Sequence, residues 1–159
     1  KHVGFLQLPV AAAKLPPSNA AIIDQSETRP KLLFDATTSW CASWTMLLHS
    51  DYSTAPTIKF TYAMTSAISG SASLDWSVWK TTSEEAVDAQ TESYASVNTC
   101  TDTAVPGTAG RITTVECLLV NADGMLPDDV ITLKACRNIS DTATGNLELM
   151  SAYFQYVKN

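Results

Sequence analysis

Hydrophobic and polar residues alternate with a period of two along most of the chain, which is the pattern of half-buried β-strands. In the clearest strand, Ile58, Phe60, Tyr62 and Met64 alternate with polar or small residues. The turn Ser69–Ser71 follows, and a second alternating segment over 72–78 completes a predicted hairpin. No twelve-residue stretch between Leu32 and Val157 shows helical spacing. About eight such strands, separated by turn residues, predict an all-β antiparallel sandwich or jelly roll over residues 20–159.

The first nineteen residues differ from the rest because prolines interrupt an otherwise apolar segment. We interpret residues 1–19 as an extended arm that lies on a surface, with a disordered tail or an edge strand as the alternatives. The apolar residues that would make its contacts are Phe5, Leu6, Leu8, Val10 and Leu15.

The last predicted strand, 147–157, is apolar on both faces, unlike a strand with one face in water. Either a bulge near Ser151 shifts the alternation or a second chain covers the outer face. The second interpretation predicts self-association, with Met150, Phe154 and Tyr156 at the subunit interface.

Composition excludes several classes of protein. The net charge of -6 and the ten basic residues among 159 disfavour binding to a nucleic-acid backbone. No apolar run approaches the roughly 20 residues of a membrane span. The prediction is therefore a soluble domain with neither a nucleic acid nor a membrane as its partner.

Catalytic and metal-binding motifs are absent from the sequence, so we expect no enzyme activity, no cofactor and no metal site. The two histidines, His2 and His49, have no marked nucleophile near them, and no nucleotide-binding or zinc-protease motif occurs. A glycosidase would need a carboxylate pair, yet Glu116 and Glu148 fall on outward positions of strands. The acidic turn 121–129 does not complete a calcium-loop pattern.

Aromatic residues leave one binding function open. Trp40, Trp44 and Trp76 fall on the apolar side of their strands and are expected in the core. Trp79 has outward parity, and Tyr94 lies in a polar stretch, so these two residues are the candidates for contact with a glycan.

The four cysteines are widely spaced and form no metal-binding pair. Cys41 and Cys117 lie in apolar surroundings. A disulfide framework remains an alternative, but because no secretion signal is visible we expect reduced thiols and assembly in a cytoplasm.

Ordered turn and strand segments resemble a family of small virion proteins of tailed bacteriophages. They are 15–20, 29–38, 62–70, 105–110, 123–129 and 142–149. The resemblance implies a jelly-roll capsid decoration or cement protein, in the virion and trimeric, bound to the major capsid protein through the arm. The alternative is a tail or fibre module that recognises host surface glycans.

Overall fold

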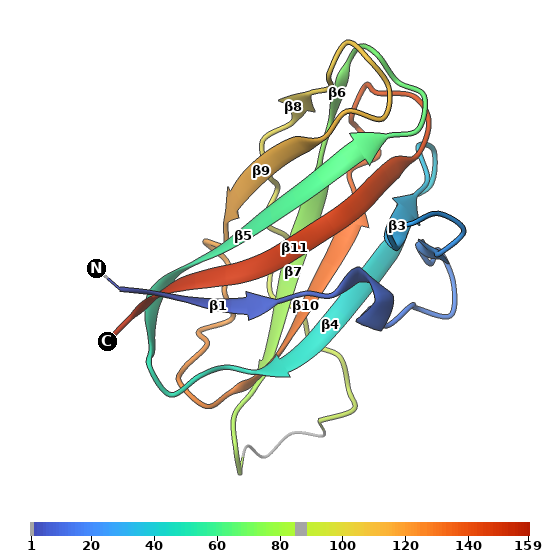
Figure 1. The fold of residues 1–159 in the computed structure, drawn as a ribbon. Helices are drawn as coiled ribbons and strands as arrows, with labels where there is room; N and C mark the ends of the chain where they lie inside the picture. The colour runs from blue at the N-terminus through green and yellow to red at the C-terminus, as the bar shows by residue number, and fades with distance from the viewer. Residues whose placement is uncertain (1, 85–88) are drawn as a thin grey trace.

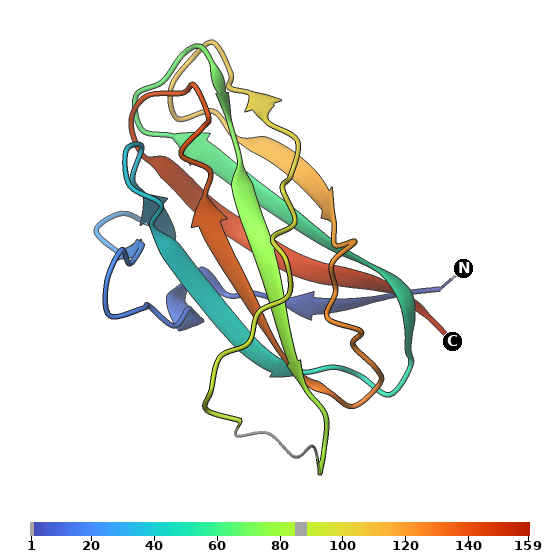
Figure 2. The same ribbon diagram turned by 180° about the vertical axis from the view of Figure 1, so that it is seen from behind.

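Two antiparallel β-sheets lie face to face in the computed structural model, which describes residues 2–84 and 89–159 (Figure 1). The larger sheet has the order β2-β3-β11-β5-β9, and β1 pairs with β11 beside β3. The smaller sheet has the order β4-β10-β7 (Figure 2). The prediction of a single all-β sandwich domain is confirmed.

The strands of the larger sheet are β1 (Val3–Gln7), β2 (Ile22–Asp24), β3 (Lys31–Phe34), β5 (Tyr52–Met64), β9 (Thr113–Leu118) and β11 (Leu147–Lys158). Those of the smaller sheet are β4 (Cys41–Leu47), β7 (Leu74–Thr81) and β10 (Val130–Arg137). The described residues also form a short pair, β6 (Ser71–Ala72) with β8 (Thr103–Ala104), and a 3-10 turn, η1 (Val10–Ala12). Within the described ranges, no helix is long and apolar enough to cross a membrane.

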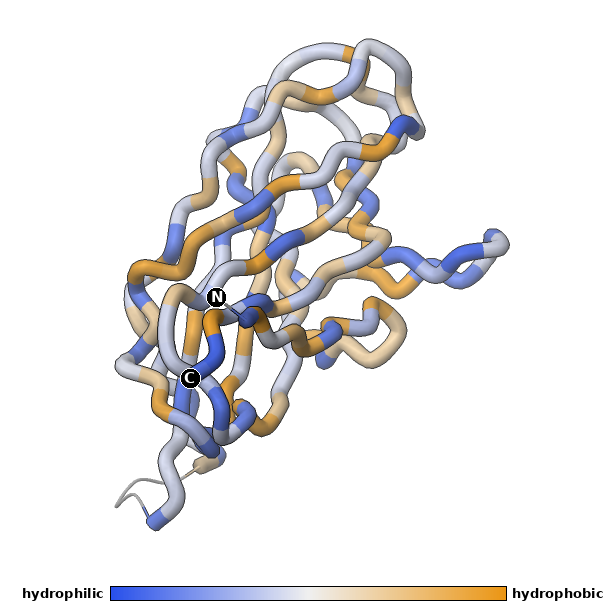
Figure 3. Tube along the Cα trace, turned by 60° about the vertical axis from the view of Figure 1, so that its left-hand side comes forward, coloured by the Kyte–Doolittle hydropathy of each residue, from blue (hydrophilic) through white to orange (hydrophobic). Residues whose placement is uncertain are grey.

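The core lies between the sheets and is built by the predicted alternation, which Figure 3 shows as changes of hydropathy along the strands. Trp44 and Trp76 are buried and stack with ring centroids 5.8 Å apart, as their parity predicts. The largest fully buried apolar side chains include Trp76, Tyr62, Tyr156, Phe34, Phe60 and Phe154.

A bulge in β11 explains the two apolar faces of the last strand. Leu149 pairs with Tyr62 of β5, and Ser151 pairs with the next residue, Thr61, so β11 carries one extra residue. The extra residue reverses the parity, and both Leu149 and Phe154 therefore point into the core. Of the two interpretations of the apolar last strand, a bulge or a covering second chain, the bulge is the one observed.

This bulge corrects the proposed subunit interface. Phe154 and Tyr156 are 0% and 1% exposed inside the chain's own core, so neither is available to a second subunit. Met150 is half-buried beside the bulge. The two apolar faces of the last strand therefore no longer support self-association, which stays a prediction.

Strand β1 and the residues that follow it pack on the domain itself. β1 pairs with β11 over Val3–Gln7, with Gly4 opposite Tyr156, where a Cβ would collide with the tyrosine ring. Leu8 and Val10 are buried in the core, and Leu6 packs against it. The segment lies on a surface, as expected, but that surface is the domain's own, so the interpretation of an arm reaching to another protein is corrected, and the edge-strand alternative describes β1.

Of the five apolar residues predicted to make the contacts of this segment, two remain exposed at the surface. Phe5 is 50% exposed and Leu15 is 36% exposed. Phe5 packs edge-on against Tyr153, with ring centroids 5.5 Å apart, on the outer face of the larger sheet.

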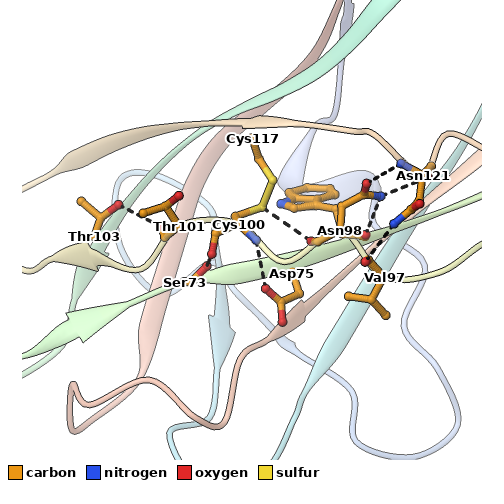
Figure 4. Close-up of a disulfide and its surroundings, with 10 residues drawn as sticks. Ser73, Asp75, Val97, Asn98, Cys100, Thr101, Thr103, Cys117 and Asn121 are labelled. Carbon is orange, nitrogen blue, oxygen red and sulfur yellow. Dashed lines mark hydrogen bonds between the residues drawn. A yellow bond between two sulfur atoms is a disulfide. The ribbon is translucent and has the colours of Figure 1, made fainter.

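All four cysteines form disulfides, so the expectation of reduced thiols is wrong. Cys41 and Cys136 are directly opposite each other in β4 and β10, with Cα atoms 4.2 Å apart. Cys100 and Cys117 join the segment after β7 to β9, with Cα atoms 5.3 Å apart (Figure 4). The second bond therefore links the segment that runs beside the smaller sheet to a strand of the larger sheet.

Candidate functional site

The outer face of the smaller sheet carries a ladder of polar side chains. Because alternate residues of a strand point to opposite faces, burying Trp44 and Leu133 in the core turns Ser43, Thr45 and Lys134 outward. Thr45 lies opposite Thr132, and their hydroxyl oxygens are 2.8 Å apart. Strand pairing thus places hydroxyl groups and one ammonium group in rows along this face.

A segment from the N-terminal part of the chain borders this face beside β4. The backbone of Lys14 exchanges two hydrogen bonds with Ser43, with N–O distances of 2.8 and 2.9 Å. Five residues later, the carbonyl oxygen of Asn19 accepts a 2.7 Å bond from the Cys41 amide. Pro16 and Pro17 lie between these two attachments. They stiffen the backbone of this border because each proline fixes its own φ.

The chain that returns after β7 forms the opposite border (Figure 2). The Ala95 amide donates to the Val78 carbonyl oxygen at 2.8 Å, and Trp76 and Asn98 form a β-bridge. Asn98 is 3% exposed, and its side chain bonds to Trp76 and Asn121 (Figure 4). The neighbouring disulfide at Cys100 anchors the same segment.

A groove lies between the two borders and contains two adjoining cavities of about 250 and about 230 Å³. Lys14 and Glu92 line both cavities. The first is also lined by Pro16, Pro17, Ser18, Asn19, Ser39, Cys41, Ala42, Ser43, Tyr94 and Lys134. The second is also lined by Thr45, Trp79, Thr81, Ala89, Gln90, Val130 and Thr132.

The two aromatic residues selected from the sequence, Trp79 and Tyr94, meet at this groove. Their rings contact edge to face with centroids 6.0 Å apart, and the Lys134 ammonium lies 3.8 Å from the centroid of the Tyr94 ring. Trp79 is half-buried and outward-facing, as its parity predicts. Contact with a glycan itself stays a prediction.

Sequence reasoning missed Lys14, Ser43, Glu92, Thr132 and Lys134. The three strand residues could have been found from parity, since each occupies an outward position between two buried residues of its own strand. Lys14 and Glu92 lie in irregular segments, and nothing in their local sequence indicates that they line one groove.

Burial raises the pKa of Tyr94 to about 12, with the nearby Glu92 carboxylate adding to the shift. Burial likewise raises the pKa of Tyr62 and of Tyr156 to about 12. The Tyr156 hydroxyl also donates to the Asp51 carboxylate at 2.8 Å, which holds its proton. At neutral pH these phenol groups are therefore uncharged hydrogen-bond donors.

We expect three of the five tyrosines to resist ionisation until about pH 12, whereas the unfolded chain should titrate near pH 10. A raised folded-state pKa means that the folded protein holds the proton more tightly. The stabilisation is complete below about pH 10 and is lost as the pH rises through 12. Absorbance titration at alkaline pH in the presence and absence of denaturant measures both curves, and coincident curves would contradict the prediction.

The carboxylates considered for a glycosidase are held in ion pairs. Glu116 contacts Lys59 at 2.7 Å, and Glu148 contacts the buried Lys31 at 2.8 Å. Asp24 and Glu27 also surround the Lys31 ammonium at 3.9 and 3.3 Å. Glu148 and Glu27 raise the pKa of Lys31, with the Glu148 hydrogen bond as the main cause. These acids are structural ion-pair partners in this arrangement.

The sequence matches no known protein family, and no curated protein matches it. Solved structures match it by fold. A family 35 carbohydrate-binding module from Clostridium thermocellum superposes with a TM-score of 0.52 and 8% identity, over 98% of this chain and 99% of that one. The CBM35 of Cellvibrio japonicus Abf62 gives a TM-score of 0.50 and 11% identity over the same shares. This chain shares the fold of those carbohydrate-binding modules.

The fold comparison overturns the resemblance to phage virion proteins. The structures from Clostridium thermocellum and Cellvibrio japonicus, which align over almost the whole chain, are carbohydrate-binding modules, and the quoted turn and strand segments are short elements that many sandwiches contain. The capsid decoration and cement interpretation is therefore wrong. Burial of Leu8 and Val10 in the domain's own core also removes two of the five residues proposed for contact with a capsid.

Proposed function

We propose that this chain is a non-catalytic carbohydrate-binding module whose groove on the outer face of β4-β10-β7 holds the sugar. The observation that carries the proposal is the meeting of Trp79 and Tyr94 above a floor of strand hydroxyl groups. A sugar ring presents C–H groups that pack on aromatic carbon and hydroxyl groups that need donors and acceptors. The groove offers both kinds of contact.

The fold supports the same function. The modules from Clostridium thermocellum and Cellvibrio japonicus extend over almost the whole of this chain, so no additional domain is left over for another activity within it. Fold likeness alone does not determine function, and the proposal therefore depends on the groove.

The disulfides support an oxidising setting. Both bonds fix a border of the groove, one at Cys41 and the other at Cys100, and such bonds persist mainly outside reducing cytoplasm. We propose accordingly that the module works in an extracytoplasmic or extracellular environment.

Replacing Trp79 tests the function directly. We expect Trp79→Ala to weaken glycan binding at least about tenfold (about 1.4 kcal/mol), because it removes an aromatic wall of the groove. Trp79→Phe, which keeps a ring, should retain most of the affinity. Isothermal titration with xylo-, gluco-, manno- and galacto-oligosaccharides, preselected on a glycan array, gives the affinities.

Phe5→Ala is the matched control because Phe5 is an exposed aromatic residue on the opposite sheet. It should leave the affinity unchanged, and near-ultraviolet circular dichroism should show all three variants folded. If Phe5→Ala abolishes binding while Trp79→Ala does not, the binding site is not this groove. If the unmodified protein binds no glycan, the proposed function is wrong.

A further inference from the structure

The groove has two compartments with the same kind of lining. Tyr94 supplies an aromatic ring to the first cavity and Trp79 supplies one to the second. The strand floor supplies the Ser43 hydroxyl to the first and the Thr45 and Thr132 hydroxyls to the second. Each cavity therefore has an aromatic side and a hydrogen-bonding floor of its own.

Each compartment is smaller than the cavities that usually hold drug-sized ligands. Cavities that hold small ligands span roughly 300–1,000 Å³, and each compartment, at about 250 and about 230 Å³, falls below that range. Taken as one continuous groove, they fall within it. A ligand that fills the groove must therefore extend through both compartments.

The boundary between the compartments is defined by the two charged residues that line both of them. Lys14 comes from the border beside β4, and Glu92 comes from the chain that returns after β7. An ammonium donor and a carboxylate acceptor there can bond to hydroxyl groups on either side of a glycosidic linkage.

The spacing of residues along the strands gives the direction in which a ligand would lie and the distance between the rows that contact it. Ser43 and Thr45 are two residues apart on β4, and so are Lys134 and Thr132 on β10, which separates the rows by about 7 Å along the strands. The two rows are therefore far enough apart for each to contact a different ring of a linked pair. The repeat of the protein surface thus runs along the strands and suits a chain of linked rings.

We infer that the site takes a run of two linked sugars lying along the strands, one ring in each compartment, with Lys14 and Glu92 contacting the junction between them. This inference rests on the proposed glycan-binding function. It assigns the ligand as an oligosaccharide segment and excludes a single terminal sugar as the full ligand.

Chain-length titration tests the inference on the disulfide-intact protein. The probes are β-1,4-linked xylo-, gluco-, manno- and galacto-oligosaccharides of one to four sugars, measured by isothermal titration or by chemical-shift changes for weak ligands. For the series that binds, we expect affinity to rise about tenfold or more from one sugar to two, and by less than threefold beyond two.

Variants at the junction separate this inference from general damage to the groove. Lys14→Ala and Glu92→Ala should each weaken binding of the disaccharide by a larger factor than binding of the monosaccharide, because the disaccharide contacts them from both compartments. Lys59→Ala, on the opposite sheet, is the matched control and should change neither.

The two possible failures are distinguishable. If the monosaccharide binds as tightly as the tetrasaccharide, the two-compartment inference is overturned and the glycan-binding function stands. If no sugar of any length binds, both the proposed function and the inference that rests on it are wrong.

Discussion

Arg137→Met should destabilise the folded domain by about 3–5 kcal/mol, the cost of breaking a buried ion pair by removing one partner. The Arg137 side chain is 0% exposed and its partner Asp141 is 1% exposed. Two guanidinium nitrogens donate to the Asp141 carboxylate, at 2.9 and 3.1 Å. The substitution leaves that carboxylate buried without its counter-charge.

The same guanidinium also organises the loop between β10 and β11. It donates to the carbonyl oxygens of Gly145 at 2.7 Å, Ala143 at 2.8 Å and Phe34 at 3.3 Å. These buried acceptors lose their donor in Arg137→Met, and each unsatisfied group adds to the cost. Urea unfolding followed by circular dichroism measures the loss of stability.

Two further variants make this test specific. Lys59→Met removes a partly exposed ion pair with Glu116 and should change stability by about 1 kcal/mol or less. The double variant Arg137→Met/Asp141→Leu removes both buried charges and should be more stable than Arg137→Met alone. A loss of under 1 kcal/mol for Arg137→Met would contradict the structural role assigned to this pair.

The second large effect concerns the disulfides, which close loops of very different length. Cys41 and Cys136 are separated by 95 residues, whereas Cys100 and Cys117 are separated by 17. By the loop-entropy relation, their removal should cost about 4.7 and about 3 kcal/mol, respectively. We expect Cys41→Ala/Cys136→Ala to lower the melting temperature more than Cys100→Ala/Cys117→Ala.

Thermal and denaturant unfolding of the two double variants measure this order, and a thiol assay on the unfolded, unreduced protein should detect no free cysteine. The shorter bond has a separate role at the groove, because Cys100 follows the Asn98 anchor of its border. Its removal should therefore weaken glycan binding more than its smaller effect on stability implies. Equal losses of stability in both variants would contradict the loop-length argument.

Much of the sandwich could be predicted because period-two alternation directly reflects one buried and one exposed face. The prediction failed where that correspondence breaks. One extra residue beside Leu149 reverses the parity of β11, and a sequence pattern cannot distinguish a bulge from a face covered by another chain. For Leu8 and Val10, apolar character indicated burial without indicating in which molecule.

The residues that line the groove could be predicted from the sequence only where they lie on strands. Outward parity identified Trp79, and the same rule identifies Ser43 and Lys134 once the partner strands are known. Lys14 and Glu92 line the same groove although 78 positions separate them in the numbering, because two irregular segments border one sheet. Disulfide pairing is likewise set by the order of strands in space.

The floor of the groove lies on strands, whereas its borders are irregular chain, and this difference has an evolutionary consequence. Both borders are irregular chain, attached to the sheet by backbone hydrogen bonds such as those between Lys14 and Ser43. Backbone bonds persist when side chains change, and surface connections tolerate substitution better than the strands they join. Residues 15–19 and 89–95 can therefore diversify toward new ligands while selection preserves the scaffold, which makes them the natural positions for a library that redirects specificity.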